Sequence, residues 1–143
     1  MNGAEWLVQT LRERGVEVVF VLCGNGLKPF LDACVDSDMK VVDTRNEQSA
    51  AYMADAWGRM TGRLGVVATS AGPGFTNALT GLANAYWDGG PLLLISGCSA
   101  AATLGQGHFQ ELDQVGMAAP VCKYARLVTC LLYTSPSPRD RQK

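Results

Sequence analysis

Glu47 is the residue in this sequence best placed to move a proton. It stands where an apolar segment, residues 39–44, gives way through Thr-Arg-Asn to a helical pattern over residues 47–62. A carboxylate in the first turn of a helix is stabilised by the helix dipole, so an ordinary first-turn acid is one interpretation. The other is a partly buried carboxylate that exchanges a proton with a nitrogen atom of a bound ligand.

A glycine-rich turn in the segment TSAGPGFTN, residues 69–77, is the second candidate. Gly72 and Gly74 flank Pro73 where a strand pattern changes into a helix pattern. Glycine on both sides would let a flat ligand approach the backbone closely. Asn77 adds an amide group, and Phe75 is expected to form an apolar wall. A turn followed by a proline at the helix start produces the same pattern without any ligand.

Two further loops carry weaker signals. Gly24 and Gly26 follow the apolar segment 16–22, where a dinucleotide-binding fingerprint would stand. Pro29 occupies the place of the third glycine, which argues against a nicotinamide site, and a tight turn explains both glycines. The polar segment 105–114 contains His108, the only histidine, which we interpret as a loop residue rather than a catalytic one.

The elements that must position these loops alternate along the chain. Strand patterns and helix patterns follow one another about every 25 residues, which predicts an α/β fold with a parallel sheet and helices on both faces. Segments 16–22 and 91–96 are continuously apolar, as in strands covered on both faces. Ligands of such sheets bind at the carboxyl ends of the strands. The expected strands are 16–22, 39–44, 64–71 and 91–97, and the expected helices are 4–14, 27–37, 47–62, 73–89 and 111–119.

Composition narrows the class of protein. The chain has 143 residues, enough for one domain, and 12 basic against 13 acidic residues give a net charge of −1. This balance argues against a nucleic-acid or membrane-surface partner, and no apolar run is long enough to span a bilayer. The first residues do not show a signal-peptide pattern. Five irregularly spaced cysteines and one histidine predict neither a disulfide framework nor a metal site. We therefore expect a cytoplasmic protein with reduced thiols.

The composition changes abruptly near residue 130. The segment CLLYTSPSPRDRQK, residues 130–143, resembles the conceptual translation of a transposase-type sequencing adapter. A C-terminal tail is the alternative. On the first interpretation, residues 1–129 are native protein, residues 130–143 are not, and the natural chain continues beyond residue 129.

Taken in order, the candidate loops resemble a known family. The chain over residues 3–128 is similar to the N-terminal pyrimidine-binding domain of thiamine-diphosphate-dependent enzymes of the acetolactate synthase-like superfamily. Asn46 stands where acetolactate synthases have histidine, and R-N-E-Q is also similar to 2-hydroxyacyl-CoA lyases and oxalyl-CoA decarboxylases. The matching strings are RNEQSAAYMADAWGRMTG (45–62), GVVATSAGPGFTNALTGLANAYWDGGPLLLISG (65–97), GHFQELDQ (107–114) and VCK (121–123).

The resemblance implies roles for individual residues. Glu47 corresponds to the glutamate that hydrogen-bonds N1′ of the aminopyrimidine and promotes the tautomer that deprotonates the thiazolium ring. The turn residues that pack around the pyrimidine correspond to Gly72, Pro73, Gly74 and Asn77. Gln110, and with it Phe109, corresponds to the segment facing the reaction centre. The loop near the substrate corresponds to Gly24, Asn25 and Gly26.

The resemblance also implies a larger enzyme. Its cofactor would be thiamine diphosphate with Mg²⁺ held by a separate C-terminal domain, FAD being a further possibility, and no metal ligand is expected within this chain. Homodimers or homotetramers would share the active site, so the chain alone should be inactive. The implied reaction is carboligation or decarboxylation of a 2-keto acid. The alternatives are 2-hydroxyacyl-CoA lyase or oxalyl-CoA decarboxylase chemistry, a non-catalytic domain of the same fold, and the nicotinamide site already weakened by Pro29.

Overall fold

Four parallel strands form the centre of the molecule. The computed structural model describes residues 2–129. Its sheet has the order β2-β1-β3-β4, and each neighbouring pair is parallel. The predicted α/β fold is therefore confirmed. The interpretation of residues 130–143 lies outside the described residues. The strands are β1 (Val18–Leu22), β2 (Lys40–Asp43), β3 (Gly65–Thr69) and β4 (Leu92–Ser96).

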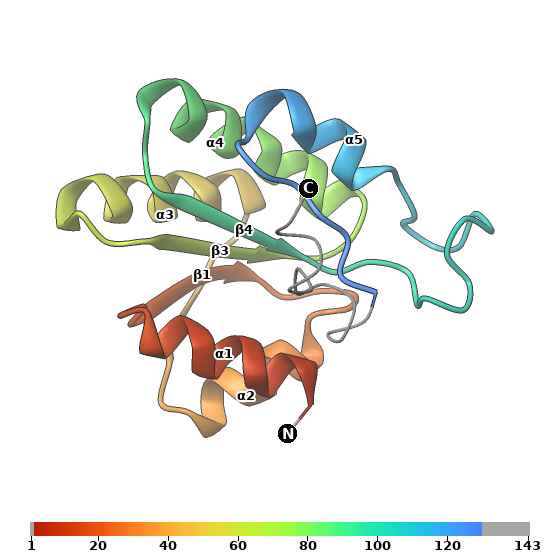
Figure 1. Cartoon of the computed structure of the whole chain (residues 1–143), viewed down its shortest axis with the longest axis horizontal. Helices are drawn as coiled ribbons and strands as arrows, with labels where there is room; N and C mark the ends of the chain where they lie inside the picture. Colours follow the sequence, from red (N-terminus) through yellow and green to blue (C-terminus); the bar gives the residue numbers. More distant parts are fainter. Residues whose placement is uncertain (1, 130–143) are drawn as a thin grey trace, which may run out of the picture.

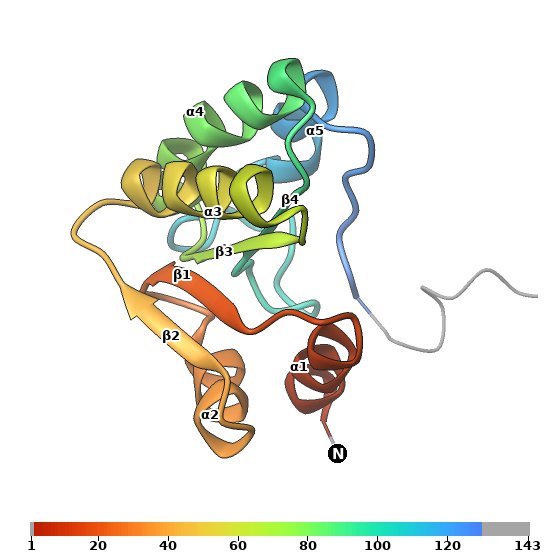
Figure 2. The same ribbon diagram turned by 90° about the vertical axis from the view of Figure 1, so that its left-hand side faces the viewer.

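Helices cover both faces of this sheet. Figures 1 and 2 show α1 and α2 on one side, α3 and α4 on the other, and α5 beside α4. The short helix predicted at 111–119 begins only at Gln114, because the Asp113 side chain caps it by accepting from the N–H of Gly116. A 3₁₀ turn, Ala119–Val121, follows it. The helices are α1 (Gly3–Glu13), α2 (Lys28–Asp36), α3 (Glu47–Thr61), α4 (Pro73–Asp88) and α5 (Gln114–Ala118).

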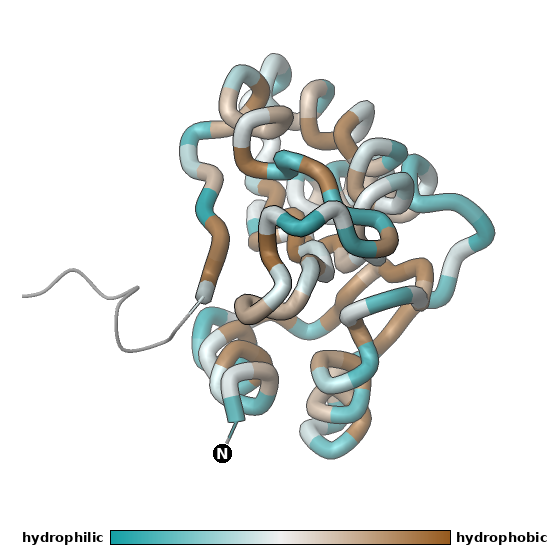
Figure 3. Tube along the Cα trace, turned by 90° about the vertical axis from the view of Figure 1, so that its right-hand side faces the viewer, coloured by the Kyte–Doolittle hydropathy of each residue, from teal (hydrophilic) through white to brown (hydrophobic). Residues whose placement is uncertain are grey.

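The central strands divide their side chains between two cores. Val19 and Val21 of β1 pack with the α1 and α2 layer, whereas Val18 and Phe20 pack with α3. This alternation follows from the two-residue period of a strand. In Figure 3 the hydrophobic tube segments gather in the middle of the molecule. The prediction that β4 is covered on both faces is confirmed, since Leu93 and Ile95 pack on one face and Leu92 and Leu94 on the other. All five of its residues are only half-buried, because β4 is an edge strand.

Small residues bring α3 unusually close to the sheet and to α4. A Cβ atom on Gly65 of β3 would lie 1.9 Å from the carbonyl oxygen of Ala54, and one on Gly81 would lie 2.5 Å from Cβ of Ala51. Ala51 and Ala54 are fully buried. The alanines and glycines of these segments therefore set the spacing between α3, α4 and β3.

This spacing gives a first prediction about stability. Replacing Gly65 by alanine should lower the free energy of unfolding by about 3 kcal/mol, because the added methyl group meets backbone rather than a movable side chain. Urea denaturation followed by circular dichroism measures the change. Gly62→Ala is the matched control, since a Cβ there meets nothing within 4 Å and costs only the strain of its positive φ. Equal losses in the two variants would contradict the packing argument.

The cysteines of the described part are free thiols. Cys23 and Cys98 are exposed, Cys122 is half-buried and Cys34 is buried. Burial raises the pKa of the Cys34 thiol to about 11, so this side chain behaves as a small apolar group of the core. No helix of residues 2–129 is both long and apolar enough to cross a membrane.

Candidate functional site

Glu47 occupies the first position of α3, at the carboxyl edge of the sheet. The helix begins there because Asn46 caps it: its side-chain oxygen accepts from the backbone N–H groups of Gln48, at 2.8 Å, and Ser49, at 3.3 Å. Asparagine is among the best residues for this task. The cap leaves the Glu47 side chain half-buried and close to the positive end of the helix dipole.

The glycine-rich turn brings α4 against this carboxylate. The Asn77 side chain donates from Nδ2 to Oε2 of Glu47 at 3.0 Å. Gly74 lies so close that a Cβ atom there would stand 3.1 Å from Oε1 of Glu47. Within residues 2–129 the side-chain donor to Glu47 is Asn77, and it binds Oε2 rather than Oε1. One oxygen of Glu47 is therefore held by the protein, and the other can accept or donate a proton.

Gly72 makes the turn that leads into α4. Its backbone has φ 61° and ψ −116°, which glycine adopts far more readily than a residue with a side chain. A Cβ there would lie 2.6 Å from the backbone oxygen of Gln110. Gln110 itself has φ 61°, and its Oε1 is buried with no hydrogen-bond partner in the described chain. Pro73, the first residue of α4, is exposed.

The loop after β1 reaches the same edge. A Cβ on Gly24 would lie 2.6 Å from Cβ of Ser70, and one on Gly26 would lie 3.0 Å from the Cα of Gly97. Asn25 is exposed, and its carbonyl oxygen lies beside Gly97. The structure thus brings the first loop against the glycine-rich turn and the end of β4.

Two aromatic residues differ in their placement. Phe109, predicted on the substrate side, is 76% exposed. Phe75, predicted as an apolar wall of the site, is 5% exposed and packs with Leu82 and Ala118 between α4 and α5. That prediction was wrong, because the helical spacing of Phe75 and Leu82 places both on the face of α4 that α5 covers.

Gln114 and Ser70 are the residues of this edge that sequence reasoning missed. The Gln114 side chain accepts from the N–H of Gly72 and donates to Ser96 and Gly97. Ser70 lies against both Gly24 and Gly74. Neither residue has a signal in its local sequence. The hydrogen-bond partners of Gln114 are 42, 18 and 17 residues away, and Ser70 contacts Gly24 from a different loop.

Glu111 orders the loop that precedes Gln114. Its carboxylate accepts from the backbone N–H of Gly105 and from that of His108, the latter at 2.9 Å. These two bonds, the Gly105 bond first, lower the pKa of Glu111 below its ordinary value. His108 lies in this exposed loop, as expected.

A pH titration tests this loop. Because the pKa of Glu111 is lower in the folded state than the ordinary value of 4.5, the ordering is complete above 4.5 and is lost as the pH falls through the lowered pKa. The amide NMR shifts of Gly105 and His108 should titrate together with a midpoint below 4.5, and Glu111→Gln should abolish that titration. A midpoint at or above 4.5 would show that the two bonds do not hold the carboxylate.

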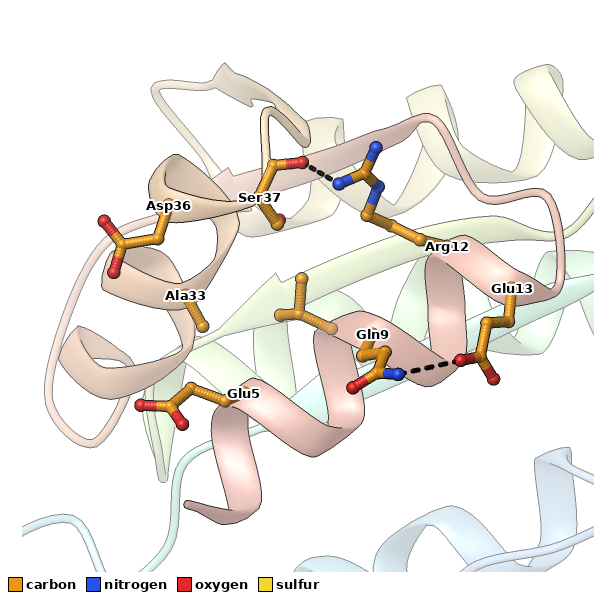
Figure 4. Close-up of a pocket in the computed structure, with 8 residues that line it drawn as sticks. Glu5, Gln9, Arg12, Glu13, Ala33, Asp36 and Ser37 are labelled. Atoms are coloured by element: carbon orange, nitrogen blue, oxygen red, sulfur yellow. Dashed lines mark hydrogen bonds between the residues drawn. The ribbon is translucent and has the colours of Figure 1, made fainter. Parts of the chain in front are cut away.

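Two open grooves lie apart from the Glu47 carboxylate. One, of about 600 Å³, runs between α1 and α2 on the other face of the sheet, and Figure 4 shows Glu5, Arg12, Glu13 and Asp36 along it. The other, of about 450 Å³, lies under the loop 98–115. Neither is lined by Glu47, Gly72, Gly74 or Asn77. In the part of the chain that the structure describes, no three His, Cys, Asp or Glu side chains are grouped to hold a metal ion.

Comparison with known proteins identifies the family of this chain. Residues 1–117 match the family described as thiamine pyrophosphate enzyme, N-terminal TPP binding domain. The 2-hydroxyacyl-CoA lyase 2 of Danio rerio is 40% identical over 138 residues, which cover 96% of this chain and 22% of that protein. A probable acetolactate synthase large subunit of Methanocaldococcus jannaschii is 40% identical over 124 residues, which cover 87% of this chain and 21% of that protein.

A third relative extends the same pattern. The acetolactate synthase large subunit of Lactococcus lactis is 40% identical over 124 residues, 86% of this chain and 22% of that protein. The chain thus spans about a fifth of the length of the curated relatives that it matches. Since the family match covers most of the chain, the chain belongs to the thiamine pyrophosphate enzymes and corresponds to their N-terminal TPP-binding domain.

Proposed function

We propose that this domain binds the aminopyrimidine ring of thiamine diphosphate and that Glu47 is the residue that activates it. One observation carries the proposal: Asn77 holds one carboxylate oxygen of Glu47, and the other faces the glycine-rich turn. A ring nitrogen hydrogen-bonded to that oxygen would meet a carboxyl group already fixed in orientation.

The residues packed around Glu47 support this assignment. Gly72 and Gly74 are buried and lack side chains at the places where a Cβ would meet Gln110 and Glu47. Gln110 contributes a buried Oε1 without a partner in the described chain, which could accept from an amino group. Glu47 and Gln110 would thus supply an acid for one ring nitrogen and an acceptor for the amino group of an aminopyrimidine.

Each residue then has a physical task. Glu47 holds a proton at Oε1 and exchanges it with the ring nitrogen, while Asn77 keeps the carboxylate in place. Gly72 and Gly74 allow close approach of the ring, and Gln110 lies on the reaction side. Thiamine diphosphate, when bound, supplies a carbon nucleophile and an electron sink. The protein supplies orientation and a fixed acid.

For the reaction, we propose carboligation or decarboxylation of a 2-keto acid by the complete enzyme, as the acetolactate synthase relatives support. The second candidate is 2-hydroxyacyl-CoA cleavage. The segment R-N-E-Q with Asn46 favours it through its resemblance to 2-hydroxyacyl-CoA lyases, and the Danio rerio relative has that name. Assays of the complete enzyme with pyruvate and with a 2-hydroxyacyl-CoA distinguish the two: turnover of pyruvate supports the first, and turnover of only the thioester supports the second.

The wider assignment follows the same resemblance. We propose that the complete enzyme is cytoplasmic, forms a homodimer or homotetramer through the active site, and holds Mg²⁺ in another domain, with FAD as a possible further cofactor.

We also propose that residues 1–129 are native and residues 130–143 derive from an adapter. DNA sequencing across codon 129 tests the last point: a frame that continues into a metal-binding domain supports it, and a stop after Lys143 contradicts it.

A further inference from the structure

Gln114 connects three segments of the sheet edge through one side chain. Its Oε1 accepts from the N–H of Gly72 at 3.1 Å, and its Nε2 donates to Oγ of Ser96 and to the carbonyl of Gly97, both at 3.1 Å. The partners fix the orientation of the amide, since only an oxygen can accept from an N–H and only a nitrogen can donate to a carbonyl.

The contacts hold both ends of the turn that leads into α4. The Gly72 N–H, at one end, is bound by Gln114 directly. The carbonyl of Ser70, at the other end, accepts from the hydroxyl of Ser96 at 3.1 Å, and that hydroxyl in turn accepts from Gln114. Residues 70–72 are therefore fixed by β4 and α5 as well as by their own strand.

The position of this turn determines the position of groups around Glu47. Gly74 and Asn77 follow the turn directly in α4, and both lie against the Glu47 carboxylate. A shift of the turn would carry both of them with it. Displacements of this kind, made far from the reacting atoms, can cost large factors in rate.

We propose that Gln114 is a positioning residue for the Glu47 site: by holding Gly72 against Ser96 and Gly97, it keeps α4 in register with the carboxylate. This role rests on the proposed function of Glu47. Gln114 does not contact Glu47, so its removal should alter the geometry of activation and leave substrate binding intact.

Gln114→Met, which keeps the length of the side chain and removes all three bonds, tests the role. In the cofactor-free protein, exchange of the Gly72 amide, followed by NMR, should accelerate about tenfold, as expected for one lost hydrogen bond. In the complete enzyme, kcat should fall about tenfold with KM for the substrate unchanged. Gln106→Met is the matched control, because Gln106 lies in the loop that precedes Gln114 and, within residues 2–129, its side-chain amide donates to the carbonyl of Ala102 alone.

A conservative variant separates positioning from general stability. Gln114→Glu retains the acceptor for the Gly72 N–H but has no donor for Ser96 and Gly97, so the Gly72 amide should stay protected while kcat still falls because the connection to β4 is lost. If the parent enzyme turns over and Gln114→Met leaves both the exchange of the Gly72 amide and kcat unchanged, the positioning role is overturned. A parent enzyme without thiamine-diphosphate-dependent turnover would overturn the proposed function, and the positioning role with it.

Discussion

Replacing Glu47 by glutamine should lower thiamine-diphosphate-dependent turnover of the complete enzyme by about 10²–10⁴-fold. The amide of glutamine occupies the same space and can still accept from Asn77, so the side chain should stay in place. It cannot exchange a proton with a ring nitrogen at neutral pH. Steady-state kinetics with saturating cofactor measure the effect.

Two controls belong with this experiment. Glu13→Gln changes an exposed carboxylate on α1 that accepts a hydrogen bond from the Gln9 side chain, and it should leave turnover unchanged. Urea unfolding of the Glu47 variant should match the parent within about 0.5 kcal/mol, as for most partly exposed substitutions. A Glu47→Gln enzyme with normal kcat would contradict the role of the carboxylate.

Replacing Gly72 by alanine should be the most damaging change in the glycine-rich turn. Two costs combine: a residue with a side chain is strained at φ 61° and ψ −116°, and its Cβ would lie 2.6 Å from the backbone oxygen of Gln110. Together these should lower the free energy of unfolding by about 3 kcal/mol. Cofactor affinity should fall as well, because Gln110 is pushed away from the turn.

Gly89→Ala is the matched control for Gly72→Ala. Gly89 also has a positive φ, 72°, but a Cβ there meets nothing within 4 Å. It should cost about 1 kcal/mol through backbone strain alone and leave cofactor binding unchanged. Calorimetric titration with thiamine diphosphate and urea unfolding compare the two variants. If they lose equal stability and bind the cofactor equally, contact with Gln110 has no part in the site.

Much of the fold could be predicted from local pattern. The predicted strand 16–22 and the predicted helices 47–62 and 73–89 end within two residues of the observed β1, α3 and α4. The partial exposure of β4 could not be predicted, because an apolar strand has the same sequence pattern in the middle of a sheet and at its edge. Strand order is set by contacts between distant segments.

In the site, too, local patterns could be predicted and contacts between distant segments could not. Glu47, Gly72, Gly74 and Asn77 stood out because they lie at strand-to-helix junctions, and the structure places Glu47 beside Gly74 and Asn77. Whether they bind the cofactor stays a prediction. Gln114 was missed because its hydrogen-bond partners, Gly72 and Ser96, lie in segments far from it in the sequence. Phe75 was misassigned because a strand-to-helix junction does not show which face of the helix a later segment will cover.

The most direct test of the account is a crystal structure of the complete enzyme with thiamine diphosphate bound. We expect the aminopyrimidine ring against Gly72 and Gly74, with its ring nitrogen within about 3.2 Å of Oε1 of Glu47. Asn77 should still hold Oε2, and Gln114 should still bind the Gly72 N–H. A pyrimidine ring bound elsewhere, with Glu47 in contact only with solvent or protein, would contradict the assignment of this site.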